Sequence, residues 1–277
     1  MMPYSVLMSV YKKEQPKHLS QAIDSMLHQT IPPKEFVLVC DGPLTIELDD
    51  VITQYEQTYK NIFKTVRLDE NVGLGLALNQ GLLACSCEII ARMDSDDVAV
   101  STRMELQLAI LEQDGCLAML GGQTAEFQDT INDIHRYRIV PLLHDDICKD
   151  MAFRNPFNHM TITFRKKAVL DAGNYQHLLG YEDYDLWARM IANGSKVQNI
   201  NEVLCYVRVD ENAYARRSGW TYFTDGVKMQ KELKSLGLVN HAQYCRNIFI
   251  RFISTVVLPN NMRSFLYKTV MRKKNNS

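Results

Sequence analysis

The chain has no run of apolar residues close to the ~20 that a helix needs to cross a bilayer. It also lacks an initial basic segment followed by an apolar core, so no signal peptide is predicted. Its 7 cysteines are scattered, and the one close pair, Cys85-Ser86-Cys87, lacks the spacing of a zinc knuckle. We therefore expect a cytoplasmic protein with reduced, mostly buried thiols.

A strong charge of one sign is also missing. The 277 residues have a formal net charge of -1, which argues against general nucleic-acid binding. The charge is nevertheless uneven, because no Asp or Glu follows Glu232. Basic residues continue to the end of the chain: Arg246, Arg251, Arg263, Lys268, Arg272, Lys273 and Lys274. The C-terminal end is thus basic in a nearly neutral protein.

Segments of strand and helix character alternate through the first 113 residues. Short apolar runs bounded by turn residues predict strands, and apolar residues at helical spacing predict helices. The predicted strands are 4–10, 35–40, 63–68 and 88–93, and the predicted helices are 18–28, 48–59, 73–84 and 102–113, the last opened by a capping box of Thr102 and Glu105. This order predicts an α/β fold with a doubly wound, mostly parallel sheet.

The pattern after residue 113 is less regular. Predicted strands are 117–127, 136–140, 160–164, 196–200 and 203–209, and predicted helices are 144–153 and 184–192. From Trp220 the pattern is helical, in three segments broken at Gly237 and Pro259. We predict one domain over residues 1–215, with halves 1–100 and 101–215, and a helical basic extension over 216–277.

The densest acidic stretch is 92–97, Arg-Met-Asp-Ser-Asp-Asp, directly after a predicted strand. Open α/β sheets bind ligands at the carboxyl ends of their strands. Clustered carboxylates repel one another, and a hard cation such as Mg²⁺ or Mn²⁺, shared with substrate phosphates, accounts for them. The stretch therefore predicts a metal-bridged diphosphate. The alternative is an acidic turn in which Ser95 and Asp97 cap the next helix.

Polar residues also end the first two predicted strands. Ser9 and Tyr11 end the first and Asp41 the second, so a parallel sheet would bring them near Asp94 and Asp96. A carboxylate can accept from a base N–H, and an aromatic ring can stack on a base. The alternatives are a turn role for Asp41, in an Asp-Gly-Pro sequence, and a partly buried aromatic for Tyr11.

Asn71-Val72-Gly73-Leu74-Gly75 opens a predicted helix, where glycines let the backbone approach a ligand. It is not a dinucleotide fingerprint, because Leu78 stands where that motif needs a small residue. A plain turn into a packed helix is the alternative for Gly75.

A second acidic cluster, Glu182 and Asp183, precedes the predicted helix 184–192. It could supply a general base, or it could complement the helix dipole. Arg208, at a strand end, could bind a phosphate or lie on the surface. His159 could contact substrate or be structural.

In this order along the chain, these motifs resemble those of the family 2 inverting glycosyltransferases with the GT-A fold. The segments that carry the resemblance are 5–11, 39–42, 71–73, 92–97 and 181–187, and the likeness spans about residues 3–210. It is strongest to bacterial enzymes that build O-antigen, capsule or exopolysaccharide. The resemblance implies a nucleotide-binding half over 1–100, an acceptor half over 101–215 and a nucleoside-diphosphate sugar as donor, with UDP slightly favoured.

The resemblance also implies roles for individual residues. Asp96 would be the direct ligand of Mn²⁺ or Mg²⁺, with Asp94 at the ribose or metal. Asp183 would be the catalytic base and Glu182 would assist acceptor binding, although the reverse assignment stays open. The remaining residues would hold the nucleotide: Ser9, Tyr11, Glu14, Asp41, Asn71, Gly73, Arg92 and Arg208.

Processive synthases of this family carry a Gln-x-x-Arg-Trp motif, and the nearest stretch here is Arg-Arg-Ser-Gly-Trp at 216–220. We therefore expect transfer of single sugars. The basic, apolar tail 244–274 either lies on the inner membrane face, near an acceptor on polyprenyl diphosphate, or packs on the core.

Two other functions compete. A sugar-phosphate nucleotidylyltransferase would normally show a glycine-rich basic loop where 11–15 stands without glycine. The third possibility is an inactive homologue that binds nucleotide sugar.

Overall fold

The computed structural model describes residues 2–128, 130–178, 180–209, 219–258 and 273–274. Strands and helices alternate in its first half, as the sequence predicts, with ends that differ from prediction by at most two residues. These elements are β1 (Tyr4–Val10), α1 (Pro16–Leu27), β2 (Glu35–Cys40), α2 (Ile46–Thr58), β3 (Phe63–Arg67), α3 (Leu74–Ala84), β4 (Ile89–Met93) and α4 (Arg103–Gln113), with the unpredicted short strand β5 (Val98–Ala99) between the last two.

The second half contributes the other side of the sheet and the helices that cover it. Its elements are β6 (Leu117–Phe127), β7 (Ile134–Arg138), α5 (His144–Met151), the 3₁₀ turn η1 (His159–Thr161), β8 (Thr163–Arg165), α6 (Lys166–Asp171), α7 (Glu182–Ala192), β9 (Lys196–Arg208), α8 (Gly219–Ser235), α9 (His241–Phe252), the π-helical turn η2 (Ile253–Val257) and β10 (Lys273–Lys274).

One mixed sheet runs through the molecule. Its strand order is β10-β7-β6-β8-β4-β1-β2-β3, with β9 beside β6 and β5. The strands β4, β1, β2 and β3 are mutually parallel, whereas β8 and β7 are antiparallel to their neighbours. Since β2 and β4 flank β1, the strand order reverses there, and open α/β sheets bind ligands at the carboxyl ends of the strands at such a point.

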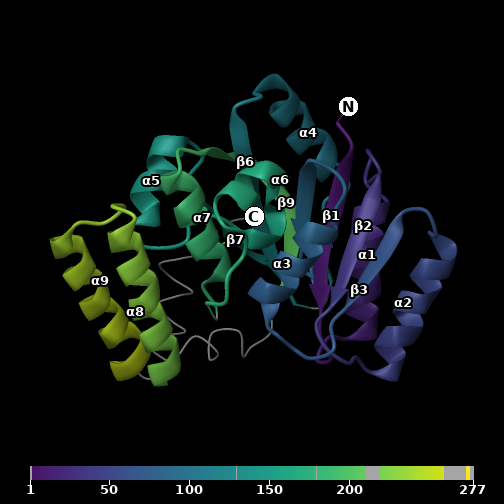
Figure 1. The fold of residues 1–277 in the computed structure, drawn as a ribbon, viewed down its shortest axis with the longest axis horizontal. Coiled ribbons are helices and arrows are strands. Elements are labelled where there is room, and N and C mark those ends of the chain that lie inside the picture. The colour runs from purple at the N-terminus through teal and green to yellow at the C-terminus, as the bar shows by residue number, and fades with distance from the viewer. Residues whose placement is uncertain (1, 129, 179, 210–218, 259–272, 275–277) are drawn as a thin grey trace.

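Helices cover both faces of this sheet (Figure 1). Side chains alternate along each strand, so Leu7 enters one apolar core while Val6 and Met8 enter the other. The core of Leu7 is closed by α3, α5, α6 and α7, and the core of Val6 by α1, α2 and α4. The predicted doubly wound α/β arrangement is confirmed.

The helices α8 and α9 lie side by side at the end of the molecule opposite α2 (Figure 1). Met229 and Leu233 of α8 join the core beside α7, and Asn247 Nδ2 of α9 donates to the Ala152 carbonyl at 2.6 Å. This part of the predicted extension thus packs on the domain. The predicted domain boundary at 215/216 and the helix expected after Pro259 lie outside the described residues. No helix in the described ranges is long and apolar enough to cross a membrane.

Four local features differ from the expectations. The strand expected at 160–164 is the turn η1 followed by β8, because backbone N–H groups there bond back within the turn. The strands expected at 196–200 and 203–209 are one strand, β9, whose register shifts against β6 accommodate its polar middle. The strand expected at 136–140 lies two residues earlier. Finally, the Thr102 side chain does not cap α4, and Glu105 accepts a bond from Thr30 Oγ1 instead.

The first residue of α4, Arg103, is a fully buried cation that joins the helix to the sheet. Its guanidinium donates to the carbonyls of Arg92, Met160 and Ile162 at 2.7–3.1 Å and to Gln107 Oε1 at 3.0 Å. Burial lowers the pKa of Arg103 to about 10, which leaves it protonated at neutral pH. The carbonyls that it satisfies belong to the end of β4 and to the turn before β8.

We predict that Arg103→Met lowers the free energy of unfolding by about 2–4 kcal/mol, because buried carbonyls lose their donor. Urea denaturation of the purified variant measures this change. The control is Arg67→Met, which removes an exposed ion pair with Asp49 and should cost at most about 1 kcal/mol. Equal losses in the two variants would contradict the role of Arg103.

Candidate active site

The acidic turn after β4 is built around a buried arginine. Arg92 is 1% exposed, and its Nη2 lies 2.5 Å from Asp94 Oδ1. The other two guanidinium nitrogens of Arg92, Nε and Nη1, have no hydrogen-bond partner among the described residues. Unused donors on a buried cation are rare, and together with the partly exposed Asp94 they make this turn a candidate functional site.

Residues from both ends of the domain converge on this turn. Ser95 Oγ donates to Glu14 Oε2 at 2.7 Å, and the backbone N–H of Arg208 donates to Asp97 Oδ1 at 2.9 Å. Arg208 Nε also donates to the Asp96 carbonyl at 3.2 Å. Ser95 and Asp97 thus tie the turn to other segments, and neither of them caps α4. The guanidinium of Arg208 lies beside the acidic turn, as a phosphate-binding role requires.

Crowded carboxylates make the turn electrostatically unfavourable when it is fully ionised. Burial and the charges of Asp94 and Glu14 raise the pKa of Asp96 to about 7. Burial and the charges of Asp96 and Asp94 raise the pKa of Asp97 well above its usual range. The described residues contain no preformed group of three or more His, Cys, Asp or Glu side chains that could hold a metal ion. Partly exposed carboxylates that repel one another fit a cation completed by phosphate oxygens, as Mg²⁺ sites usually are.

The carboxylate of Asp41 organises the neighbouring loop. Its Oδ1 accepts from Val72 N at 2.7 Å, and its Oδ2 accepts from Gly73 N at 3.1 Å and Asn71 Nδ2 at 2.9 Å. Gly73 has a φ of 89°, a conformation that favours glycine. The side chain of Asp41 and the segment from Asn71 to Gly73, about 30 residues later in the sequence, are therefore held together. Each carboxylate oxygen can accept two bonds, so Oδ1 keeps one further acceptor position.

The strand register sets the positions of Ser9 and Tyr11. Because β1 lies between β2 and β4, its end lies between Asp41 and the acidic turn. Ser9 pairs with Val39 of β2, and Met8 pairs with Met93 of β4. Tyr11 is 44% exposed and therefore lies at the surface. The topology thus brings the predicted nucleoside-binding residues to one edge of the sheet.

The second acidic cluster lies in the first turn of α7. Asp183 Oδ2 accepts from Asn155 Nδ2 at 2.6 Å, and Oδ1 accepts from Tyr184 N at 2.7 Å. Burial, followed by the charge of Asp183, raises the pKa of Glu182 to about 7. Burial also raises the pKa of Asp183, against the effects of hydrogen bonds and of Arg92. These side chains also lie in the first turn of α7, where acids complement the helix dipole.

A close approach of two backbones joins this cluster to the nucleotide side. A Cβ on Gly75, at the start of α3, would overlap the Gln176 carbonyl and lie 3.1 Å from the Glu182 Cβ. Gly75 therefore does more than open a helix, since it lets α3 pack against the segment that leads into α7. The loop held by Asp41 and the second acidic cluster are consequently neighbours.

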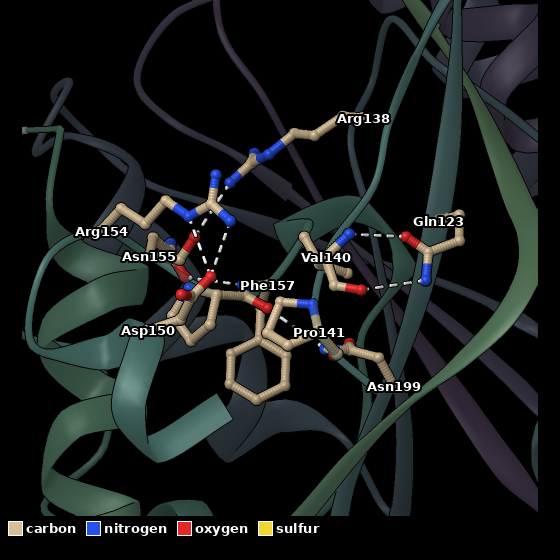
Figure 2. A network of polar contacts seen from close by, with 10 residues as sticks. Gln123, Arg138, Val140, Pro141, Asp150, Arg154, Asn155, Phe157 and Asn199 are labelled. Carbon is tan, nitrogen blue, oxygen red and sulfur yellow. Dashed lines mark hydrogen bonds and ion pairs between the residues drawn. The ribbon is translucent and has the colours of Figure 1, made fainter. Parts of the chain in front are cut away.

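The structure also identifies a residue that the sequence did not single out as a site residue, Asn155. It lies in the polar network of Figure 2, between α5 and η1, and bonds directly to Asp183. Its position in a polar loop before Pro156 was the only sequence signal. His159 of the same segment is buried, with Nε2 3.0 Å from the Tyr175 hydroxyl, which is the structural alternative named for it.

Comparison with known proteins identifies the family of this chain. The model of the family described as glycosyl transferase family 2 matches residues 5–181. An uncharacterized glycosyltransferase of Haemophilus influenzae is 40% identical over 98% of this chain and 100% of its own length. The amylovoran biosynthesis glycosyltransferase AmsE of Erwinia amylovora is 36% identical over 96% of this chain and 98% of its own. The UDP-Gal:alpha-D-GlcNAc-diphosphoundecaprenol beta-1,3-galactosyltransferase of Escherichia coli is 34% identical over 98% of this chain and 97% of its own length.

Solved structures share the fold at lower identity. S. aureus TarS 1-349 in complex with UDP-GlcNAc has a TM-score of 0.68 at 16% identity, and the match covers 97% of this chain and 76% of that one. The mannosyltransferase PcManGT of Pyrobaculum calidifontis, in complex with GDP-Man and Mn²⁺, has a TM-score of 0.64 at 15% identity. This match covers 95% of this chain and 72% of that one. These likenesses show the GT-A fold. With the family match and the relatives above, they establish that the chain belongs to glycosyl transferase family 2.

Proposed function

We propose that this glycosyltransferase moves a single sugar, with inversion, from a nucleoside-diphosphate sugar to a hydroxyl of a growing bacterial surface glycan. The observation that carries the proposal is the presence of two acidic clusters near one buried cation, Arg92. One is the turn at Asp94 and Asp96, and the other is Glu182 with Asp183, which adjoins the nucleotide loop at Gly75. A displacement at a sugar carbon needs charge compensation on the leaving-group side and a base on the acceptor side.

The donor would lie along the carboxyl ends of β2, β1 and β4. The free acceptor position on Asp41 suits a base N–H such as that of uracil, and the exposed ring of Tyr11 suits stacking on the base. Ser9 and the segment from Asn71 to Gly73 would complete the nucleoside site. UDP remains the favoured nucleotide, because UDP-Gal is named as donor for the Escherichia coli relative.

The diphosphate would lie against the acidic turn. Asp96 and Asp94 would hold Mn²⁺ or Mg²⁺, the cation type present in the mannosyltransferase with the same fold. Such a cation, when bound, neutralises charge on the departing diphosphate. Glu14 fixes the turn through Ser95, and the guanidinium of Arg208 would bind phosphate oxygens. The buried Arg92 orients Asp94.

On the acceptor side, Asp183 would be the catalytic base. Two N–H donors fix both of its oxygens, which aligns the carboxylate. It would take the proton from the acceptor hydroxyl while that oxygen bonds to the anomeric carbon and the bond to the diphosphate breaks. Glu182, on the side of the donor loop, would assist acceptor binding. Attack from the face opposite the leaving group inverts the anomeric carbon.

The acceptor would be carried on a polyprenyl diphosphate, as the name of the Escherichia coli relative states for that enzyme. A membrane-facing surface on the C-terminal helices suits such an acceptor. Trp220, Phe249, Ile250 and Val257 are all more than half exposed. Basic residues, with no acidic ones, follow Glu232 to the end of the chain, a combination that favours anionic lipid surfaces. The enzyme would thus work at the cytoplasmic face of the inner membrane.

The competing functions have less support. Membership in family 2 and the lack of glycine at 11–15 oppose a nucleotidylyltransferase. All four carboxylates of the two clusters are retained, which opposes an inactive homologue.

We predict that Asp183→Asn lowers kcat for sugar transfer by about 10²–10⁴-fold with little change in donor KM, because only proton removal is lost. Radiolabelled transfer from a panel of nucleotide sugars to a polyprenyl-diphosphate-linked sugar measures it. The matched variant Asp171→Asn, at the exposed end of α6, should keep full activity. Full activity of Asp183→Asn would contradict the proposed base.

The raised pKa of Glu182 gives a pH prediction. Its carboxyl is protonated below about pH 7 and can donate one hydrogen bond there, and it becomes a charged acceptor at both oxygens only as the pH rises through 7. The acceptor KM of the wild-type enzyme should therefore change between pH 6 and pH 8, whereas that of Glu182→Gln should stay constant. Initial rates at several acceptor concentrations measure both, and parallel profiles would refute the assignment of Glu182 to acceptor binding.

Vesicle sedimentation tests the membrane surface. Wild-type protein should bind phosphatidylglycerol vesicles and not phosphatidylcholine vesicles, and the double variant Phe249→Ser/Ile250→Ser should bind about tenfold more weakly, because apolar contact area is lost. Leu83→Ser, a similarly exposed position on α3, is the control and should bind normally. Unchanged binding of the double variant would show that α9 does not contact the lipid.

A further inference from the structure

Asn155 lies between the acceptor-side carboxylate and a rigid part of the fold. It is partly buried, in the segment between α5 and η1. Its Nδ2 donates to Asp183 Oδ2 at 2.6 Å, a distance typical of a strong hydrogen bond to a charged acceptor. Twenty-eight residues separate the two in sequence, so the contact depends on how the segment is held.

The orientation of the Asn155 amide is fixed by its own neighbours. Its Oδ1 accepts from the backbone N–H of Phe157 at 3.1 Å, so the amide cannot rotate by 180° without losing that bond. The Asn155 carbonyl accepts from Arg138 Nη2 of β7 at 3.2 Å. Beside it, Arg154 pairs with Asp150 at 2.7 Å, within the same network (Figure 2). Nδ2 is therefore the amide atom that faces Asp183.

The surrounding segment is anchored on three sides. The Tyr184 hydroxyl of α7 donates to the Met151 carbonyl, and Asn247 of α9 donates to the Ala152 carbonyl. Phe157 is fully buried and packs edge-on against the Trp187 ring of α7. The segment that carries Asn155 is thus bound to the helix that carries Asp183, which keeps the distance between them constant.

We propose that Asn155 is a positioning residue for the catalytic base: its amide holds one oxygen of Asp183 and keeps the carboxylate ionised and aimed at the acceptor hydroxyl. The inference rests on the proposed role of Asp183. A donor bonded to a carboxylate favours its charged form, and a general base works only in that form. Other charged or titratable groups of the described residues that act on Asp183 or feel its charge are Arg92 on β4, Arg138 on β7, Tyr175 before α7, and Glu182 and Tyr184 on α7.

The sign of the pH effect follows from this contact. Removal of the amide takes away a bond that favours the ionised carboxylate, so the pKa of Asp183 rises. The acidic limb of the kcat/KM profile should then move to higher pH, and activity should recover in part above it. A purely structural role would lower activity evenly at every pH.

The test uses Asn155→Ala in the full chain, with initial rates from pH 5 to pH 9 and nucleoside-diphosphate binding by calorimetry. We expect kcat at pH 7 to fall about tenfold to a hundredfold, the acidic limb to move up by about one pH unit, and donor binding to stay within about threefold. The isosteric Asn155→Asp places a second carboxylate beside Asp183. The acidic limb of its pH profile should therefore move to higher pH than that of Asn155→Ala. The matched control is Asn193→Ala at the other end of α7, with a wild-type profile expected.

Two results would overturn the inference: a wild-type profile for Asn155→Ala, or a loss that is the same at every pH. The double variant Asn155→Ala/Asp183→Asn should be no slower than Asp183→Asn alone, because Asn155 acts through that carboxylate, and additive losses would also contradict it. Asp183→Asn by itself distinguishes failure of the proposed base from failure of the role of Asn155. If that variant keeps full activity, the proposed base is wrong; if it is inactive while Asn155→Ala is normal, only the role of Asn155 fails.

Discussion

The buried ion pair between Arg92 and Asp94 is the interaction on which the rest of this site depends. The guanidinium is fully enclosed, lies 2.5 Å from Asp94, and its positive charge also acts on Asp96, Asp97, Glu182 and Asp183. Because one buried cation acts on both acidic clusters, the repulsion between their carboxylates is reduced. Arg103 supports this arrangement by donating to the Arg92 carbonyl.

The negative charge that Arg92 leaves uncompensated in the two acidic clusters indicates what each cluster would bind. The pKa values of Asp96 and Glu182 both lie near 7, since burial and neighbouring carboxylates act in the same direction at the two places. Unfavourable charge of this kind is tolerated where a ligand relieves it. On the donor side that ligand would be a cation with a diphosphate, and on the acceptor side a hydroxyl proton. The family resemblance and the electrostatics therefore point to the same division of labour.

The sequence predicted the sheet well where burial decides the structure. The runs 4–10 and 35–40 are enclosed on both sides, so their apolar pattern sets both ends of β1 and β2, and the topology then brings Asp41, Tyr11 and Asp94 to one edge. It failed where tertiary contacts decide. The polar middle of β9 suggests a break, but pairing with β6 absorbs it, and Glu105 bonds to Thr30 of another segment instead of closing a capping box.

The same reasoning explains which site residues were found. Acidic pairs at strand and helix ends can be recognised locally, whereas the value of Asn155 depends on Asp183, 28 residues later, and on Arg138 from a third segment. No local sequence pattern predicts that these three residues lie next to one another. The roles assigned to Ser9, Glu14, Arg208 and the other residues expected at the nucleotide sugar stay predictions. The structure gives the positions of these residues, whereas their roles are defined by contacts with a ligand.

Calorimetric titration of the purified protein with UDP, GDP, CMP and dTDP, with and without Mn²⁺, tests whether the acidic turn binds a metal and a diphosphate. We expect that one nucleoside diphosphate binds tightly only with Mn²⁺ and that Asp96→Ala loses this binding. The unchanged fold of the variant can be checked by its thermal unfolding. Failure of all four nucleotides to bind, or equal binding to Asp96→Ala, would contradict the metal–diphosphate site and leave the carboxylates of 94–97 as a structural turn.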